Sequence, residues 1–196
     1  MPVNREAAER AIADFLRALG FDPREHPDLT ETPARVTEAF ARDLLRGHAV
    51  DTQRLLNEGS CAAPESAKGG FVAVTRIAVA TVCPHHLLPA LGTAQVVYLP
   101  GSKLLGIGTI SALVDAFARR LTLQEEIGQN VVHALMTGAG ARGAYCELEL
   151  SHSCLRARGE QQSHALVRTS ARAGDYAHAE SLPEIALALG RMRSSS

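Results

Sequence analysis

The sequence has few cysteines, no marked excess of either charge and no long apolar run. Four cysteines in 196 residues are too few for a disulfide scaffold, so we expect a reducing, cytoplasmic setting with free thiols. A formal net charge of −1 gives no reason to expect nucleic acid or a membrane surface as a partner. No apolar stretch approaches the length of a transmembrane helix, and charged residues interrupt the N-terminus where a signal peptide needs an apolar core.

The first third of the chain is predicted to be helical. Residues 5–19 carry apolar side chains at helical spacing. Thr32 and Pro33 form a helix start, and that helix should bury Val36, Phe40, Leu44 and Leu45 and end near Gly47. Residues 57–70 are rich in Gly, Ala, Ser and Pro. We therefore expect an N-terminal helical region (1–56), a linker (57–70) and a main domain (71–196).

The main domain is predicted to contain both strands and helices. Residues 71–82 and 93–99 are expected to be strands. The apolar positions from Ile110 to Leu121 predict a helix, and Thr122–Glu125 has the form of a capping box opening a second helix toward Gly138. From Ala144 the residues alternate, and a last strand is expected around 164–170. This β-β-α-α-β-β order predicts an α+β fold, with an antiparallel sheet and helices on one face.

Two clusters of cysteine and histidine stand at the ends of predicted strands. They read Cys83-Pro84-His85-His86 and His152-Ser153-Cys154, and extending the alternation from Ala144 puts His152 and Cys154 on the apolar side of their strand. Thiolate and imidazole are preferred zinc ligands, and a catalytic zinc keeps three protein ligands with water in the fourth position. Because paired Cys-x-x-Cys knuckles are absent from the sequence, a closed structural site is disfavoured. Cys61 and Cys146 are interpreted as small apolar residues.

Several motifs together resemble the GTP cyclohydrolase I family. They cover roughly residues 28–172 and are Thr-Pro-x-Arg-Val at 32–36, Cys-x-His-His at 83–86, Phe-Ala-Arg-Arg-Leu at 117–121, Gln-Glu at 124–125, and His-x-Cys-x-x-Ala-Arg-Gly at 152–159. The resemblance implies the tunnelling fold, in which β-β-α-α-β-β sheets join around a barrel into homo-oligomeric rings, commonly decamers. The segment 71–196 would then be the tunnelling-fold catalytic domain.

The resemblance also implies roles for individual residues. Cys83, His86 and Cys154 would bind Zn²⁺, and His85 and His152 would transfer protons. Zinc lowers the pKa of a bound water to about 7, so that the water can attack C8 of a guanine ring at neutral pH and formate can leave. Gln124 and Glu125 match the guanine contacts, and Arg35 and Arg158 match phosphate contacts. The alternative for Glu125 is the capping box alone.

The sequence departs from the family at the phosphate end of the pocket. Family members carry Gly-Leu-Ser-Lys followed shortly by Arg, and the matching Ser, Lys and Arg positions are Gly108, Thr109 and Ala112 here. A further basic position is Glu38, and Pro84 replaces the Glu of the usual Cys-Glu-His-His. Each lost charge-assisted contact costs on the order of 1.5–3 kcal/mol of binding free energy.

Three hypotheses about function follow. In the first, a zinc-dependent hydrolase opens the imidazole ring of a guanine nucleotide or related purine at C8 and releases formate, with an altered phosphate requirement. In the second, the chain is a full GTP cyclohydrolase I that makes 7,8-dihydroneopterin triphosphate. In the third, it is a zinc-stabilised oligomeric binding protein without turnover, against which His85 and His152 argue.

Overall fold

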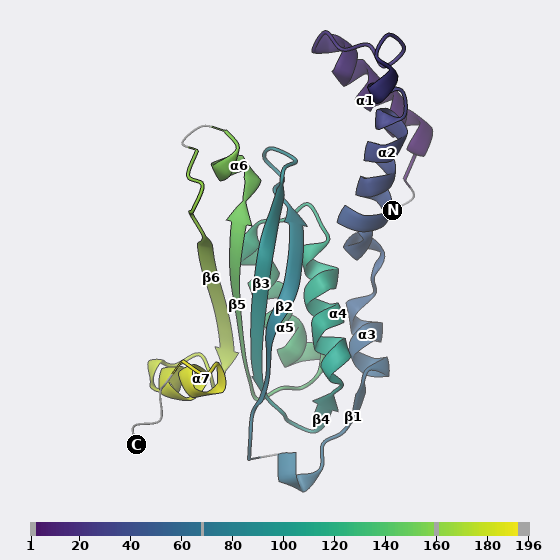
Figure 1. Cartoon of the computed structure of the whole chain (residues 1–196). Coiled ribbons are helices and arrows are strands. Elements are labelled where there is room, and N and C mark those ends of the chain that lie inside the picture. The colour runs from purple at the N-terminus through teal and green to yellow at the C-terminus, as the bar shows by residue number, and fades with distance from the viewer. Residues whose placement is uncertain (1–2, 68, 159–160, 192–196) are drawn as a thin grey trace.

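A four-stranded antiparallel sheet forms the centre of the protein (Figure 1). In the computed structural model, which describes residues 3–67, 69–158 and 161–191, the strand order is β2-β3-β5-β6. These strands are β2 (Val72–Val82), β3 (Pro89–Leu99), β5 (Gly143–His152) and β6 (Val167–Gly174). With α4 (Ile107–Ala118) and α5 (Gln124–Gly138) between β3 and β5, the predicted β-β-α-α-β-β order and the α+β class are confirmed.

The core lies between the sheet and helices α4 and α5. Cys146, Leu148 and Leu150 alternate along β5 and are fully buried, as are Ile127 and Leu135 on α5. The period of two along the strand and the helical spacing along α5 turn these residues toward each other. The predicted alternation and the interpretation of Cys146 as a small apolar residue are therefore confirmed.

The N-terminal helices form an arm that extends away from the sheet (Figure 1). It contains α1 (Arg5–Ala18), a 3₁₀ turn η1 (Pro27–Leu29), α2 (Thr32–Glu38) and a π-helical continuation η2 (Ala39–Leu44). The four residues predicted to point inward, from Val36 to Leu45, are only half-buried, because α2 packs mainly on α1. Among the described residues, no helix has the length and apolar character needed to cross a bilayer.

The arm joins the main domain through tightly packed segments. After the 3₁₀ turn η3 (Arg46–Ala49) come α3 (Thr52–Glu58), β1 (Ser60–Ala62) and a 3₁₀ turn η4 (Glu65–Ala67). A Cβ added at Gly47 would lie 2.2 Å from the Ala116 carbonyl oxygen, so only glycine lets the chain pass this close to α4. The segment 57–70 that we predicted as a linker contains β1, which pairs with β4 (Lys103–Leu105).

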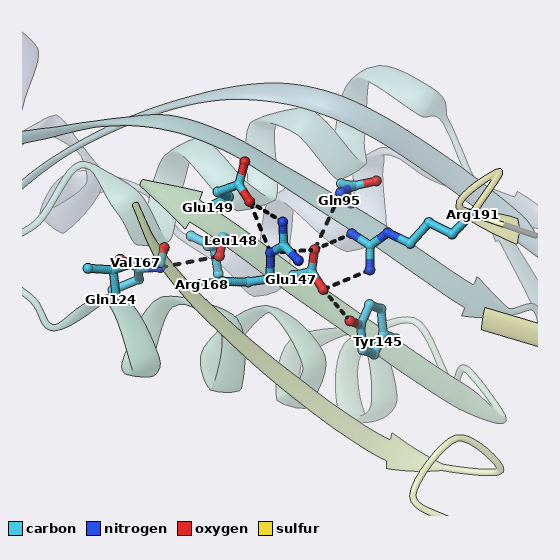
Figure 2. A network of polar contacts seen from close by, with 9 residues as sticks. All are labelled: Gln95, Gln124, Tyr145, Glu147, Leu148, Glu149, Val167, Arg168 and Arg191. Atoms are coloured by element: carbon cyan, nitrogen blue, oxygen red, sulfur yellow. Dashed lines mark hydrogen bonds and ion pairs between the residues drawn. The ribbon is translucent and has the colours of Figure 1, made fainter. Parts of the chain in front are cut away.

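The sheet face opposite α4 and α5 is partly covered by the C-terminal part of the chain. There the 3₁₀ turn η5 (Ala179–Ser181) leads into α7 (Leu182–Ala188), and Arg191 reaches back to Glu147 on β5 (Figure 2). Glu147 is 5% exposed, and both of its oxygens accept hydrogen bonds from the Arg191 guanidinium. Tyr145 donates a further bond to Glu147 over 2.8 Å. A carboxylate is thus held on this face by an arginine from the C-terminal segment.

The Glu147 network has a defined dependence on pH. Burial acts to raise the pKa of Glu147, but the hydrogen bonds and charges of Arg191, Tyr145 and Arg168 outweigh burial, so the pKa is lowered. Because the pKa of Glu147 is lower in the folded state than in the unfolded state, ionised Glu147 stabilises the fold. This stabilisation is fully present above the unfolded-state pKa of about 4.3. It is lost as the pH falls through the folded-state pKa.

We predict that Arg191→Leu lowers the free energy of unfolding at pH 7 by about 1–3 kcal/mol, because a buried acceptor loses its main donor. Urea unfolding measures this, and the difference from the wild type should shrink in acid as Glu147 becomes protonated. The control is Arg54→Leu, which removes an exposed ion pair with Glu58 and should cost less than about 1 kcal/mol. Equal losses in the two variants would contradict the role given to Arg191.

Candidate metal centre and cavity

The strand register brings the two cysteine and histidine clusters to the same end of the sheet. Val82 on β2 lies opposite Pro89 on β3, and Ala90 on β3 lies opposite His152 on β5. The β2–β3 loop that carries Cys83 therefore lies next to the last residue of β5. The chain then turns into α6 (Ser153–Arg156), a single helical turn that carries Cys154. The prediction that Cys154 continues the strand alternation is wrong, since the strand ends at His152.

The β2–β3 loop is a tight turn closed by its own backbone. The Cys83 N–H donates to the Leu88 carbonyl over 3.0 Å, and the Leu87 N–H donates to the Cys83 carbonyl over 2.9 Å. Leu87 has φ 55°, in the left-handed region that a branched side chain rarely adopts. Together with the fixed φ of Pro84, this conformation holds the two histidines of the loop at the end of the sheet.

Cys83, His86 and Cys154 form a cluster with the spacing of a metal site. Their ligand atoms all lie within 4.8 Å of one another, and Cys83 Sγ is 3.7 Å from His86 Nδ1. Ligand atoms of a tetrahedral zinc site are about 3.5–3.8 Å apart, as follows from the usual Zn–S and Zn–N bond lengths. The donor set and the spacing therefore fit zinc. His85 Nδ1 lies 3.9 Å from Cys83 Sγ, but His85 is not part of the cluster.

A cavity of about 220 Å³ opens beside this cluster. It brings together seven of the residues selected from the sequence, namely Cys83, His85, His86, Gln124, Glu125, His152 and Cys154. It is also lined by Thr81, Thr122, Leu123 and Val167, which sequence reasoning missed. Thr81 is 2% exposed, and its hydroxyl has no hydrogen-bond partner in the described part of the chain. In the sequence Thr81 looks like any β-branched residue of a strand, so nothing distinguishes it from its neighbours.

The start of α5 settles which glutamate caps the helix. Thr122 Oγ1 donates to Glu126 Oε2 over 2.8 Å, and the Leu123 N–H donates to the same oxygen over 3.3 Å. The capping box predicted for Thr122–Glu125 is therefore displaced by one residue. Glu125 has no part in it, and its exposed carboxylate faces the cavity.

The Gln124 side chain is buried, with 4% of its surface exposed. Its amide NH₂ donates to the Leu148 carbonyl over 3.2 Å and to the Val167 carbonyl over 2.9 Å (Figure 2). Its Oε1 lies 2.7 Å from His152 Nε2. The amide thus connects the first turn of α5 with both β5 and β6 and with the histidine in the cavity.

The electrostatics of the cavity follow from burial and from neighbouring charges. Burial lowers the pKa of His152, and the Glu125 carboxylate partly offsets this. Burial also raises the pKa of Cys154, and the neighbouring Cys83 adds to the increase, whereas the charge of Arg158 acts in the opposite direction. A cation bound beside Cys154 would act in the opposite direction to burial and favour its thiolate.

The residues matched to phosphate contacts lie away from the cavity lining. Arg35 is on α2 in the N-terminal arm, where it pairs with Glu31. Arg158 follows α6 and acts on Cys154 through its charge. Gly108, Thr109 and Ala112 are on the first half of α4, next to β4 and at the end of the sheet opposite α6 (Figure 1). Gly159, the last residue of the motif that begins at His152, lies outside the described residues.

Comparison with known proteins identifies the family. The family model described as GTP cyclohydrolase I matches residues 8–190. A protein named GTP cyclohydrolase 1 from Leifsonia xyli is 35% identical over 187 residues, which cover 95% of this chain and 96% of that protein. One of the same name from Campylobacter lari is 35% identical over 176 residues, which cover 90% of each chain.

Among solved structures, the apo form of an archaeosine synthase QueF-Like is similar to this chain. The TM-score is 0.41 and the sequence identity is 17%, and the match covers 53% of this chain and 93% of that one. The matching family model and the two relatives span nearly the whole chain, and the residues that line the cavity all lie within the segment matched by the family model. The chain belongs to the GTP cyclohydrolase I family and is an enzyme of that family.

Proposed function

We propose that this enzyme is a zinc-dependent cyclohydrolase that opens the imidazole ring of a guanine nucleotide or related purine at C8 and releases formate, with an altered phosphate requirement. The observation that carries the proposal is the cavity in which a Cys-His-Cys cluster, two further histidines and the exposed Glu125 carboxylate meet. In this proposal Cys83, His86 and Cys154 hold the metal. When bound, zinc lowers the pKa of a coordinated water and polarises the atom that is attacked.

The remaining cavity residues supply proton transfer and recognition. Opening the ring adds one water across C8–N9 and leaves a formamide on N7; a second water cleaves N7–C8 and yields formate and an amine. Each cleavage needs a proton delivered to the departing nitrogen. His152 and His85, which line the cavity, would provide these protons. The Glu125 carboxylate would accept from the N1–H and the exocyclic amine of guanine.

The altered phosphate requirement is supported by side chains on α4 and α2, which lie away from the cavity in one chain and would meet the substrate's phosphates across a contact between copies in the proposed ring. Gly108 has no hydroxyl, and the Thr109 hydroxyl donates to the Gly59 carbonyl over 3.2 Å, so it already has a partner. Ala112 carries no charge. Glu38 is paired with Arg5 and Arg42. None of these four positions offers a free cation or a free hydroxyl to a phosphate group.

We also propose that the enzyme works as a homo-oligomeric ring in a reducing compartment such as the cytoplasm. In the monomer both β2 and β6 are edge strands of the sheet, with backbone groups available to neighbouring copies. Two thiolate ligands need a reducing environment to remain free for metal.

The substrate preference is tested by measuring formate release from guanosine, GMP and GTP. We expect kcat/KM for GTP to be no higher than for GMP, because the phosphate contacts matched to these four positions on α4 and α2 are lost. The variant Gly108→Ser/Thr109→Lys/Ala112→Arg should raise kcat/KM for GTP at least about tenfold, since 1.4 kcal/mol corresponds to a factor of ten. Gln129→Lys on the exposed side of α5 controls for added charge. Efficient conversion of GTP by the wild type into a product that oxidises to a fluorescent pterin would overturn the altered requirement.

The metal assignment is tested by zinc content. Cys154→Ser should reduce bound zinc from about one per chain to a small fraction, because a hydroxyl is a poor substitute for a thiolate ligand. Inductively coupled plasma mass spectrometry after chelator-free purification measures this. Cys61→Ser changes an exposed cysteine outside the cluster and should keep its zinc. Retention of full zinc by Cys154→Ser would exclude Cys154 as a ligand.

The proton role of His152 is tested by substitution. His152→Ala should lower kcat for formate release by about 10²-fold or more, the usual contribution of a general acid–base group, while zinc content stays unchanged. His133→Ala removes an exposed histidine from α5 and should have no effect on kcat. An unchanged kcat in His152→Ala would refute the assigned role.

A further inference from the structure

The Gln124 amide has only one orientation that its neighbours allow. The oxygens of Leu148 and Val167 are backbone carbonyls, which accept hydrogen bonds and cannot donate them. The NH₂ group must therefore face these two oxygens, and Oε1 must face His152. Exchanging the amide nitrogen and oxygen would place Oε1 against two carbonyl oxygens in a buried position, so the assignment does not depend on His152.

This orientation determines which nitrogen of His152 carries a proton. Oε1 of Gln124 only accepts, so the partner 2.7 Å away, Nε2 of His152, must be the donor. In a neutral ring Nδ1 is then the nitrogen with a free lone pair. No described residue forms a hydrogen bond with Nδ1, and His152 lines the cavity. Nδ1 is thus the ring nitrogen that is left to interact with a substrate in the cavity.

We propose that Gln124 is a positioning residue, which fixes the Nε2–H tautomer and the ring orientation of His152, and that its side-chain amide does not bind the purine. This inference rests on the proposed function for the proton role of His152. Oε1 of Gln124 only accepts, so it selects the ring with a proton on Nε2, and its own position is fixed by the two carbonyls.

The position of Gln124 is itself held by the fold. The Leu148 carbonyl is on β5 and the Val167 carbonyl is on β6. These two strands pair as far as Leu150 and Val167, so both carbonyls lie near the end of the paired segment. The amide joins these strands to the first turn of α5 (Figure 2). If Gln124 only stabilised the fold, its two bonds to backbone carbonyls would be sufficient. The third bond, to His152 in the cavity, would not be needed.

Two variants distinguish a role of Gln124 in positioning His152 from a role in stabilising the fold alone. Gln124→Glu keeps an oxygen that accepts from Nε2–H but loses both donors to the carbonyls, whereas Gln124→Leu loses all three bonds. Long-range ¹H–¹⁵N correlation spectra of histidine-labelled, zinc-loaded protein report the tautomer, with the His152 signal assigned from its loss in His152→Gln. We expect the Nε2–H tautomer in the wild type and in Gln124→Glu, and a mixture of tautomers in Gln124→Leu. Gln129→Leu on the exposed side of α5 is the matched control.

Kinetics provide the second readout. Gln124→Leu should lower kcat for formate release by about tenfold or more with KM changed less than twofold, because the side chain does not touch substrate. An Nδ1–H tautomer in the wild type, an unchanged tautomer in Gln124→Leu, or a rise in KM with constant kcat would overturn the proposal. If no purine yields formate, the proposed function fails, but the spectra still decide whether Gln124 fixes the tautomer.

Discussion

The antiparallel register of β2, β3 and β5 is the constraint on which the cavity depends. Because side chains alternate along a strand, a slip of one residue would turn His152 to the opposite face and move the Cys83 loop by more than 3 Å along the sheet. The buried residues Cys146, Leu148 and Leu150 oppose such a slip, since each would leave the core. The same apolar side chains that stabilise the domain therefore also align Cys83, His86 and Cys154.

The two ends of the sheet carry different parts of the family's chemistry. At the end near α6, the metal cluster, His85, His152 and Glu125 are all present around one cavity. At the other end, the positions on α4 matched to phosphate contacts carry two small residues, Gly108 and Ala112, and a threonine bonded to Gly59. The family relationship covers nearly the whole chain, whereas the departures lie at the positions matched to phosphate contacts and at Pro84 in the loop of Cys83. This division is why we propose ring opening and treat the phosphate requirement separately.

Much of the fold and of the metal cluster could be predicted from the sequence, because strand alternation, helical spacing and cysteine–histidine spacing are local patterns. The order of the main elements, the apolar side of β5 and the Cys83-His86-Cys154 set all follow from such patterns and from the family motifs. What could not be predicted depends on contacts between distant segments. Glu126 takes the capping role through Thr122, and Gln124 bonds to carbonyls on β5 and β6. Neither choice is visible in the spacing of Gln124, Glu125 and Glu126 alone.

The bond between Thr109 and Gly59 links the C-terminal end of α3 to the first turn of α4. A Cβ added at Gly59 would lie 2.1 Å from Thr109 Oγ1, so any side chain at residue 59 conflicts with the present residue 109. Residues in direct contact show non-additive effects when substituted. Replacing Thr109 alone would not open position 59, because the added Cβ would also lie 2.9 Å from the Leu55 carbonyl oxygen. A side chain at residue 59 therefore requires both a smaller residue 109 and a shift of the backbone that ends α3. Position 59 is thereby restricted to glycine for as long as α3 ends as it does.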